Sequence, residues 1–206
     1  QKTFRSIEIE QIRKDLDVLY RHATRVGKIT GDLLAFSRQS SSECATVELN
    51  TITKRVISLT EFTIRKKRIG LHKALAPDLP LVWANASKLE QAIYNIIYNA
   101  YQATDPGGTI TIKTFPNQNG GTLLEIADTG RGIAKDTIEH IFEPFFTTKE
   151  MGEGTGLGLS LSYGIIQEFG GTINVQSEPG KGTIFTILLD SAEKLKSNGS
   201  HAALAL

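Results

Sequence analysis

The sequence predicts an α+β fold, a two-layer sandwich of helices on one face of a mixed β-sheet, preceded by one long helix. Three observations support this prediction. Helix-like and strand-like segments are mixed along the chain. Two of the strand-like segments flank a hairpin signal, Asn117-Gln118-Asn119-Gly120-Gly121. The first 38 residues repeat their apolar positions with the spacing of a separate, extended helix.

Composition describes an ordinary globular protein with room for one domain and an appendage in 206 residues. A net charge of +1 gives no electrostatic case for nucleic acid, and none is expected as a partner. The single cysteine, Cys44, excludes an internal disulfide and fits a reducing compartment, so we expect a cytoplasmic location. No run of 18 apolar residues occurs, and the chain begins at Gln1 rather than methionine. We therefore expect this chain to be a fragment of a longer protein. Anchoring of that parent protein in the inner membrane stays open.

The N-terminal helix, residues 1–38, is expected to need a partner. Its positions spaced alternately by three and four are almost all apolar: Ile9, Ile12, Leu16, Leu19, Ala23, Val26, Thr30 and Leu33. About 30 helical residues extend roughly 45 Å, too far for one small core to cover. The partner is then a second copy of the chain or an upstream segment. The alternative is an amphipathic helix that lies on its own domain.

The serines at 40–42 mark a linker, which leads to the prediction of a domain over 39–190 and a flexible tail over 191–206. Asn50 is expected to cap a helix that ends near Arg68, and Ser87 to cap the next helix. A third helix is expected near 157–169. Strands are expected at 69–75, 109–115, 122–127, 172–177 and 182–189.

Asn95 and Asn99 lie four residues apart, and hence on one face of the predicted helix. Their carboxamide oxygens are hard, neutral ligands of the kind that suit Mg²⁺, which also binds substrate phosphates. Two asparagines on a helix are more often simply solvated, so this pattern needs support from other segments.

Asp128-Thr129-Gly130-Arg131-Gly132-Ile133 follows a predicted strand. A carboxylate there can accept a hydrogen bond from an adenine amino group, and glycines allow the backbone to approach a flat ring. An ordinary strand-to-helix turn is the alternative.

A second glycine-rich segment, Gly154-Thr155-Gly156-Leu157-Gly158-Leu159, opens a predicted helix. Backbone N–H groups at a helix N-terminus bind anions, here phosphates. The segment is neither a Walker A loop nor a dinucleotide-binding GxGxxG. A flexible loop remains the alternative.

The preceding segment, Phe142–Lys149, combines aromatic residues with Thr148 and a lysine beside these glycines. It is typical of the hinge of a lid, from which Lys149 could reach a phosphate as a point charge. Core phenylalanines and a solvated lysine are the alternative.

Taken in their order along the chain, these four segments resemble the N, G1, F and G2 boxes of sensor histidine kinases. The stretch 180–183 resembles the last glycine box of these kinases. The sequence of residues Phe142–Lys149 most resembles the corresponding segment of nitrogen-regulation-type kinases. The resemblance covers about residues 7–190 and implies the ATP-binding fold shared with gyrase and Hsp90. It also implies a homodimer formed through the N-terminal helix, a phosphoprotein intermediate, and a response regulator receiver domain as partner.

Carried over residue by residue, the resemblance implies that Asn95 and Asn99 hold Mg²⁺ and phosphates. It implies that Asp128 binds adenine, with Gly130, Gly132, Ile133 and Thr183 beside it. The lid and phosphate loop would comprise Thr148, Lys149, Gly154, Thr155, Gly156, Leu157 and Gly158. Asn95 and Lys149 would serve catalysis, by positioning and by neutralising charge.

Two features depart from the family pattern. None of the four histidines is followed by an acidic residue in the manner of a phosphoacceptor box, which is expected upstream of Gln1. Gln102 stands where many relatives have a lysine. The expected function is transfer of the ATP γ-phosphoryl to a histidine and thence to a response regulator. The alternatives are a nucleotide-binding regulatory module and a gyrase-like ATPase. Asn95 disfavours the ATPase, because asparagine cannot act as a general base.

Overall fold

The computed structural model describes residues 10–16, 18, 19, 27, 43–149 and 154–197. The chain divides into two compact units, one formed by residues 1–40 with 148–155 and one by 41–147 with 156–206. In the first unit, residues 10–16, 18 and 19 are helical, and the side chains of Ile12, Leu16 and Leu19 are exposed. The other positions of the expected apolar seam lie outside the described residues, as does most of the expected helix.

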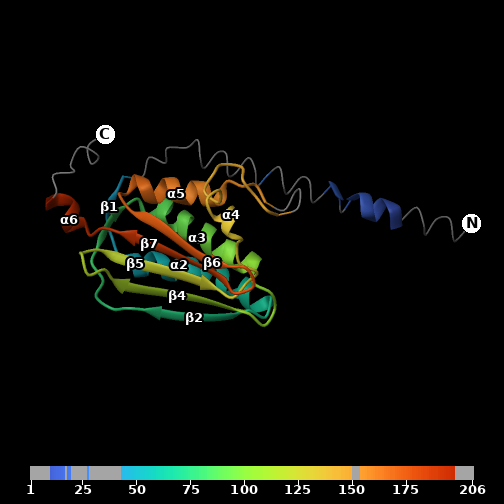
Figure 1. The fold of residues 1–206 in the computed structure, drawn as a ribbon, viewed down its shortest axis with the longest axis horizontal. Helices are drawn as coiled ribbons and strands as arrows, with labels where there is room; N and C mark the ends of the chain where they lie inside the picture. The colour runs from blue at the N-terminus through green and yellow to red at the C-terminus, as the bar shows by residue number, and fades with distance from the viewer. Residues whose placement is uncertain (1–9, 17, 20–26, 28–42, 150–153, 198–206) are drawn as a thin grey trace, which may run out of the picture. The chain divides into compact units, whose positions relative to one another are not determined.

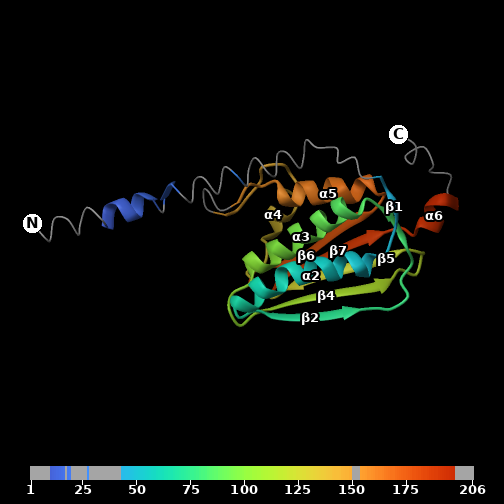
Figure 2. The same cartoon turned by 180° about the vertical axis from the view of Figure 1, so that it is seen from behind.

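The second unit is the predicted two-layer sandwich, with a mixed sheet on one side and helices on the other (Figures 1 and 2). The sheet has five strands in the order β2-β4-β5-β7-β6. Their bounds are β2 (Gly70–Leu75), β4 (Thr109–Pro116), β5 (Thr122–Asp128), β6 (Thr172–Glu178) and β7 (Gly182–Leu189). β2 pairs with β4 in parallel, and the other pairs are antiparallel. Each strand lies within one residue of its predicted bounds.

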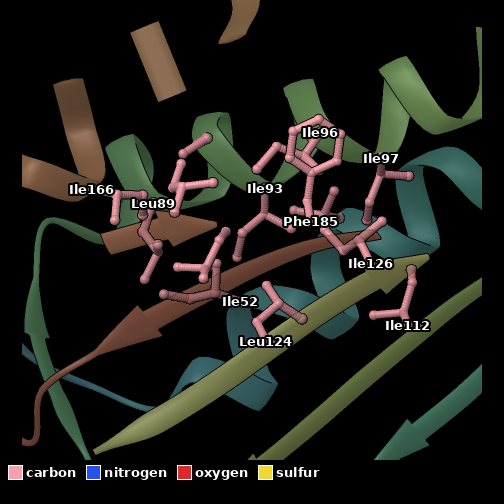
Figure 3. Packing of buried hydrophobic residues seen from close by; sticks show 14 of the residues in the cluster. Ile52, Leu89, Ile93, Ile96, Ile97, Ile112, Leu124, Ile126, Ile166 and Phe185 are labelled. Carbon is pink, nitrogen blue, oxygen red and sulfur yellow. The ribbon is translucent and has the colours of Figure 1, made fainter. Parts of the chain in front are cut away.

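Three helices cover one face of the sheet: α2 (Leu49–Lys66), α3 (Ala86–Ala103) and α5 (Gly158–Glu168). α3 lies centrally, in contact with α2, α5 and β5. Its fully buried side chains Ile93, Ile96 and Ile97 recur at helical spacing and meet Leu124 and Ile126 of β5 (Figure 3). A period of 3.6 on α3 thus meets a period of 2 on β5 within the core, to which α2, β4, α5 and β7 also contribute buried side chains.

Four short elements were not predicted. β1 (Ala45–Val47) pairs antiparallel with β3 (Val82–Ala84), α4 (Lys135–Ile138) follows β5, and α6 (Ala192–Ser197) follows β7. Strands of three residues are too short to show an alternation, and helices of four to six residues are too short to show a face.

Both predicted helix caps are wrong. Asn50 lies inside the first turn of α2, where it is buried; its amide donates to the Ala76 carbonyl at 2.7 Å and accepts from the Thr114 hydroxyl at 2.8 Å. It therefore joins α2 to the sheet instead of capping the helix. α3 is capped by Asn85, whose side chain accepts from the Lys88 N–H at 3.1 Å, and Ser87 lies within the first turn. α2 ends at Lys66, two residues before the predicted end.

We predict that Asn85→Ala lowers the free energy of unfolding by about 1–2 kcal/mol, because it leaves the Lys88 N–H without its cap. Ser87→Ala, at the exposed position that the sequence indicated, should change it by less than about 0.5 kcal/mol. Urea denaturation of both variants measures the difference. A larger loss in the Ser87 variant would contradict the observed cap.

Candidate functional site

A buried carboxylate ends the central strand of the sheet. Asp128 is the last residue of β5 and is only 6% exposed. Its Oδ1 accepts from the Gly130 N–H at 2.8 Å, and Thr183 is its register partner on β7. Burial raises the pKa of Asp128, and backbone hydrogen bonds from Gly130 and Thr183 partly oppose that rise. A carboxylate held this way keeps capacity to accept further hydrogen bonds.

The segment after Asp128 is packed against backbone on two sides. A Cβ at Gly130 would overlap the Ala103 carbonyl at the end of α3, and the Arg131 N–H donates to that same carbonyl at 3.2 Å. Gly132 has φ of +68°, and a Cβ there would overlap the Glu178 carbonyl of β6. Only glycine permits both this conformation and this approach. The segment is therefore fixed between α3 and the β6–β7 hairpin.

The start of β7, at the turn of that hairpin, packs closely against the backbone of Asp128. Gly182 has φ of +100°, and a Cβ at this residue would overlap the Asp128 carbonyl oxygen. The Gly180 N–H donates to the Arg131 carbonyl at 2.8 Å, and the Ile133 N–H donates to the Ser177 hydroxyl at 2.8 Å. Asp128, Gly130, Gly132, Ile133 and Thr183, all predicted from sequence, thus come together at one end of the sheet.

A second group of predicted residues gathers where α3 meets the start of α5. Asn95 is half-buried on α3, and its Nδ2 donates to the carbonyl oxygen of Gly158 at 3.1 Å. Gly158 is the first residue of α5. Because Nδ2 is engaged with Gly158, the carbonyl end of the Asn95 amide is directed elsewhere. Asn99 is half-buried one turn further along the same face.

The start of α5 is shaped by the glycines before it. Gly156 has φ of +69°, a Cβ there would overlap the Phe145 backbone, and its carbonyl accepts from the Phe145 N–H at 3.0 Å. Leu157 is buried. The first N–H groups of the 11-residue helix α5 have no partner within the helix, and such groups are where helices bind anions.

α3 links these two groups of residues. Asn95 and Ala103 are eight residues apart on α3, and hence about 12 Å apart along the helix axis. One end of α3 holds the Gly130 segment, and its middle contacts the first turn of α5. A helix packed on the sheet therefore fixes the separation between the Asp128 end of the candidate site and the start of α5.

The remaining predicted residues, Thr148, Lys149, Gly154 and Thr155, belong to the first unit, so the site is built from the second unit alone. Residues 150–153 lie outside the described part of the chain. Of the aromatic residues before them, Phe142 and Phe146 pack against the core, and the Phe142 ring lies 5.0 Å from that of Tyr163. Phe145 is exposed and has φ of +68°.

Sequence reasoning did not find two serines that connect the site. The Ser162 hydroxyl on α5 is buried and donates to the Gly158 carbonyl at 2.8 Å. The same carbonyl oxygen accepts from Asn95 Nδ2. The Ser177 hydroxyl on β6 accepts a hydrogen bond from the Ile133 N–H. Single serines in a helix and in a strand carry no sequence pattern, so only the folded arrangement identifies them.

Residues 84–193, just over half of the chain, match the family described as histidine kinase-, DNA gyrase B-, and HSP90-like ATPase. The chain belongs to this family. The matched range contains Asn95, Asp128, Gly158 and Thr183, so both ends of the site lie within it. Membership of an ATPase-like family supports ATP as the substrate of the domain.

Among curated relatives, the chain is 34% identical to sensor histidine kinase ZraS of Escherichia coli K12 over 84% of the chain and 36% of ZraS. It is 39% identical to sensor kinase CckA of Brucella abortus over 85% of the chain and 20% of CckA. The chain thus spans about a third or less of these relatives. None of these names tests the finer resemblance to nitrogen-regulation-type kinases, which stays a prediction.

Solved structures of the same kind share the fold. The catalytic domain of histidine kinase ThkA matches 72% of this chain and 96% of its own, at 31% identity and a TM-score of 0.65. ThkA in complex with response regulator protein TrrA matches 89% of this chain and 52% of its own, at 26% identity and a TM-score of 0.72. ShkA in complex with AMPPNP matches 80% of this chain and 36% of its own, at 27% identity and a TM-score of 0.69. Within the described residues, no helix is long and apolar enough to cross a bilayer.

We predict that Asp128→Asn abolishes ATP binding yet does not destabilise the fold at neutral pH. Between its ordinary pKa of 3.8 and the raised value, Asp128 binds more protons in the folded state than in the unfolded state. Stability contributed by this group therefore falls as pH rises through that window. Asparagine does not ionise, so the melting temperature of the variant relative to the unaltered chain should be higher at neutral pH than near about pH 4.

Fluorescent-nucleotide titration and thermal melts at the two pH values test both halves of this prediction. Asp136→Asn, at an exposed position on α4, is the matched control and should leave both measurements unchanged. Unchanged nucleotide affinity in the Asp128 variant would refute the assignment of its carboxylate to the base.

Proposed function

We propose that this chain binds Mg·ATP and forms the ATP-binding catalytic region of a sensor histidine kinase. In this role it delivers the γ-phosphoryl to a histidine and, through that histidine, to an aspartate of a response regulator. The observation that carries the proposal is the hydrogen bond from Asn95 to Gly158, which joins two predicted motifs 63 residues apart. It joins the face of α3 that carries Asn95 to the first residue of α5, and this contact supports a phosphate site there.

The base would bind at the end of β5. Asp128 accepts from the exocyclic amino group of adenine, and the backbone of Gly130, Gly132 and Ile133 approaches the ring. Thr183 lies across from Asp128 on β7 and adds a hydroxyl. Adenine suits this position because burial raises the pKa of the Asp128 carboxylate. A hydrogen-bond donor on the ligand then stabilises the ionised carboxylate in place of the water that burial excludes.

The phosphates and the metal ion would lie along the middle of α3. Asn95 and Asn99 offer carboxamide oxygens one helical turn apart, and such hard, neutral donors fit Mg²⁺ that is also held by phosphates. Bound Mg²⁺ supplies charge neutralisation on the transferring group. The N–H groups at the start of α5, from Gly156, Leu157 and Gly158, bind phosphate oxygens. Thr148, Lys149, Gly154 and Thr155 are proposed to complete this phosphate loop as a lid.

The side chain at position 95 favours kinase action over hydrolysis. An asparagine can orient a nucleophile or a phosphate, but it has no basic lone pair with which to deprotonate water. Catalysis would then consist of positioning and of charge neutralisation by Lys149 and the metal ion, with the nucleophile supplied by an imidazole. The alternative functions, a nucleotide-binding regulatory module and a gyrase-like ATPase, share the nucleotide site and differ in this step.

The partners proposed are a second copy of the chain, through the N-terminal helix, and a response regulator receiver domain. The exposed apolar side chains of Ile12, Leu16 and Leu19 support the first. The likeness to ThkA, which was solved with a response regulator protein, supports the second. Because its proposed substrate is ATP and its proposed partner is a response regulator, the domain is proposed to lie on the cytoplasmic side of any membrane that the whole protein contacts.

We predict that Asn95→Asp slows autophosphorylation of the full-length protein by about tenfold or more, because a negative charge then faces the phosphates and the Gly158 carbonyl loses one of its two side-chain donors. Initial rates of ³²P incorporation from ATP measure this. Asn174→Asp introduces the same charge at an exposed position of β6 and should have no effect. An unaltered rate in the Asn95 variant would remove this residue from the mechanism.

A second prediction concerns the metal ion. Titration calorimetry of the 206-residue chain with ATP should show binding in the presence of Mg²⁺ that weakens by about tenfold or more when EDTA removes the ion, because the phosphate charges lose their neutralisation. Steady-state phosphate release in the same buffer should stay near background. Appreciable release would favour the ATPase alternative, and absence of any heat with Mg·ATP would overturn the nucleotide site.

A further inference from the structure

Ser177, on β6, is the centre of a small hydrogen-bond network beside Asp128. Its hydroxyl accepts from the Ile133 N–H at 2.8 Å, donates to the Gly182 carbonyl at 2.8 Å and lies 2.9 Å from the Thr183 hydroxyl. Ser177 is half-buried, and Thr183 is buried. One side chain therefore contacts the segment that follows Asp128 and both residues at the start of β7.

The three contacts use the full capacity of a serine hydroxyl, which has one proton to donate and two lone pairs. The Ile133 N–H can only donate, so it occupies one lone pair. Ser177 donates its single proton to the Gly182 carbonyl, which can only accept. The Thr183 hydroxyl therefore donates to the second lone pair of Ser177.

The direction of the bond between Thr183 and Ser177 matters because of where Thr183 lies. It is the register partner of Asp128 across β5 and β7. Asp128, ionised, can only accept hydrogen bonds. The edge of adenine carries a donor, the amino group, beside an acceptor, a ring nitrogen. Asp128 can accept from the amino group, and Thr183, whose proton is given to Ser177, presents only lone pairs beside that carboxylate.

We propose that Ser177 is a positioning residue for base recognition. It fastens the segment 129–133, and with it Asp128, to the β6–β7 hairpin. By accepting the Thr183 proton, it also leaves only lone pairs of Thr183 next to that carboxylate. This inference rests on the proposed nucleotide site and adds a residue that supports its selectivity.

The other attachments of the segment 129–133 to the β6–β7 hairpin explain why the Ser177 hydroxyl affects the whole segment. The segment is held to the hairpin through Ile133 to Ser177, through Gly180 to Arg131 at 2.8 Å, and by the contact of Gly132 with the Glu178 backbone. Of these three attachments, only the one to Ser177 uses a side chain. It is therefore the attachment that a substitution can remove without moving the backbone.

The test compares ATP with purine riboside triphosphate, which lacks the amino group, by calorimetry on the 206-residue chain. For Ser177→Ala we expect the dissociation constant for Mg·ATP to rise about fivefold to tenfold, the effect of losing one or two ordinary hydrogen bonds. The preference for ATP over purine riboside triphosphate should fall by a similar factor, because a loosened Asp128 gains less from the amino group. Ser177→Thr keeps a hydroxyl and should keep the preference.

Ser58→Ala is the matched control: Ser58 is exposed on α2, its hydroxyl bonds only within its own helix, to the Lys54 carbonyl, and both constants should be unchanged. Ser177→Cys, which keeps the shape but bonds weakly, should behave like the alanine variant and serves if the latter does not fold. Equal weakening of both nucleotides, or unchanged constants with a lowered melting temperature, would reduce Ser177 to a structural residue and overturn the inference. Failure of the unaltered chain to bind Mg·ATP would instead overturn the proposed function, and the role of Ser177 with it.

Discussion

The burial of one carboxylate at the end of a central strand is the constraint on which the rest of the site depends. Asp128 lies among close-packed backbone, and burial raises its pKa. Such a group is unfavourable to keep ionised unless donors surround it, which Gly130 and Thr183 partly provide. Space for those donors exists because glycines replace side chains on both neighbouring loops. An acceptor with capacity to spare, in a place shielded from water, is suited to selecting a base.

The helix α3 converts this local arrangement into a site of defined length. Its isoleucine face packs on β5, so the helix cannot shift relative to Asp128 without opening the core. Its other face carries Asn95 and Asn99, and the hydrogen bond to Gly158 ties that face to α5. Ser162 gives the same carbonyl a second donor from within α5. Rigid packing therefore sets the separation of the two ends, as catalysis by positioning requires.

Membership of a family that includes histidine kinases, gyrase and Hsp90 leaves the fate of the phosphoryl group to be determined by individual side chains. A basic side chain at position 95 would activate water or a hydroxyl, whereas a carboxamide can only orient groups. Neutral imidazole is already a nucleophile and needs no such activation. The presence of Asn95 thus supports the proposal that the domain holds ATP for a separate acceptor group.

The sequence by itself determined the fold class and the five main strands to within one residue, and it predicted the residues of the candidate site, because each of these depends on local patterns. Alternating apolar residues specify a strand, helical spacing specifies a face, and glycine runs mark close approach. The tertiary structure alone decided that Asn50 joins α2 to the sheet, that Asn85 caps α3, and that β1 pairs with β3. It alone found Ser162 and Ser177. A lone polar side chain takes its role from the partner that folding brings to it from elsewhere in the chain, and no local pattern records that partner.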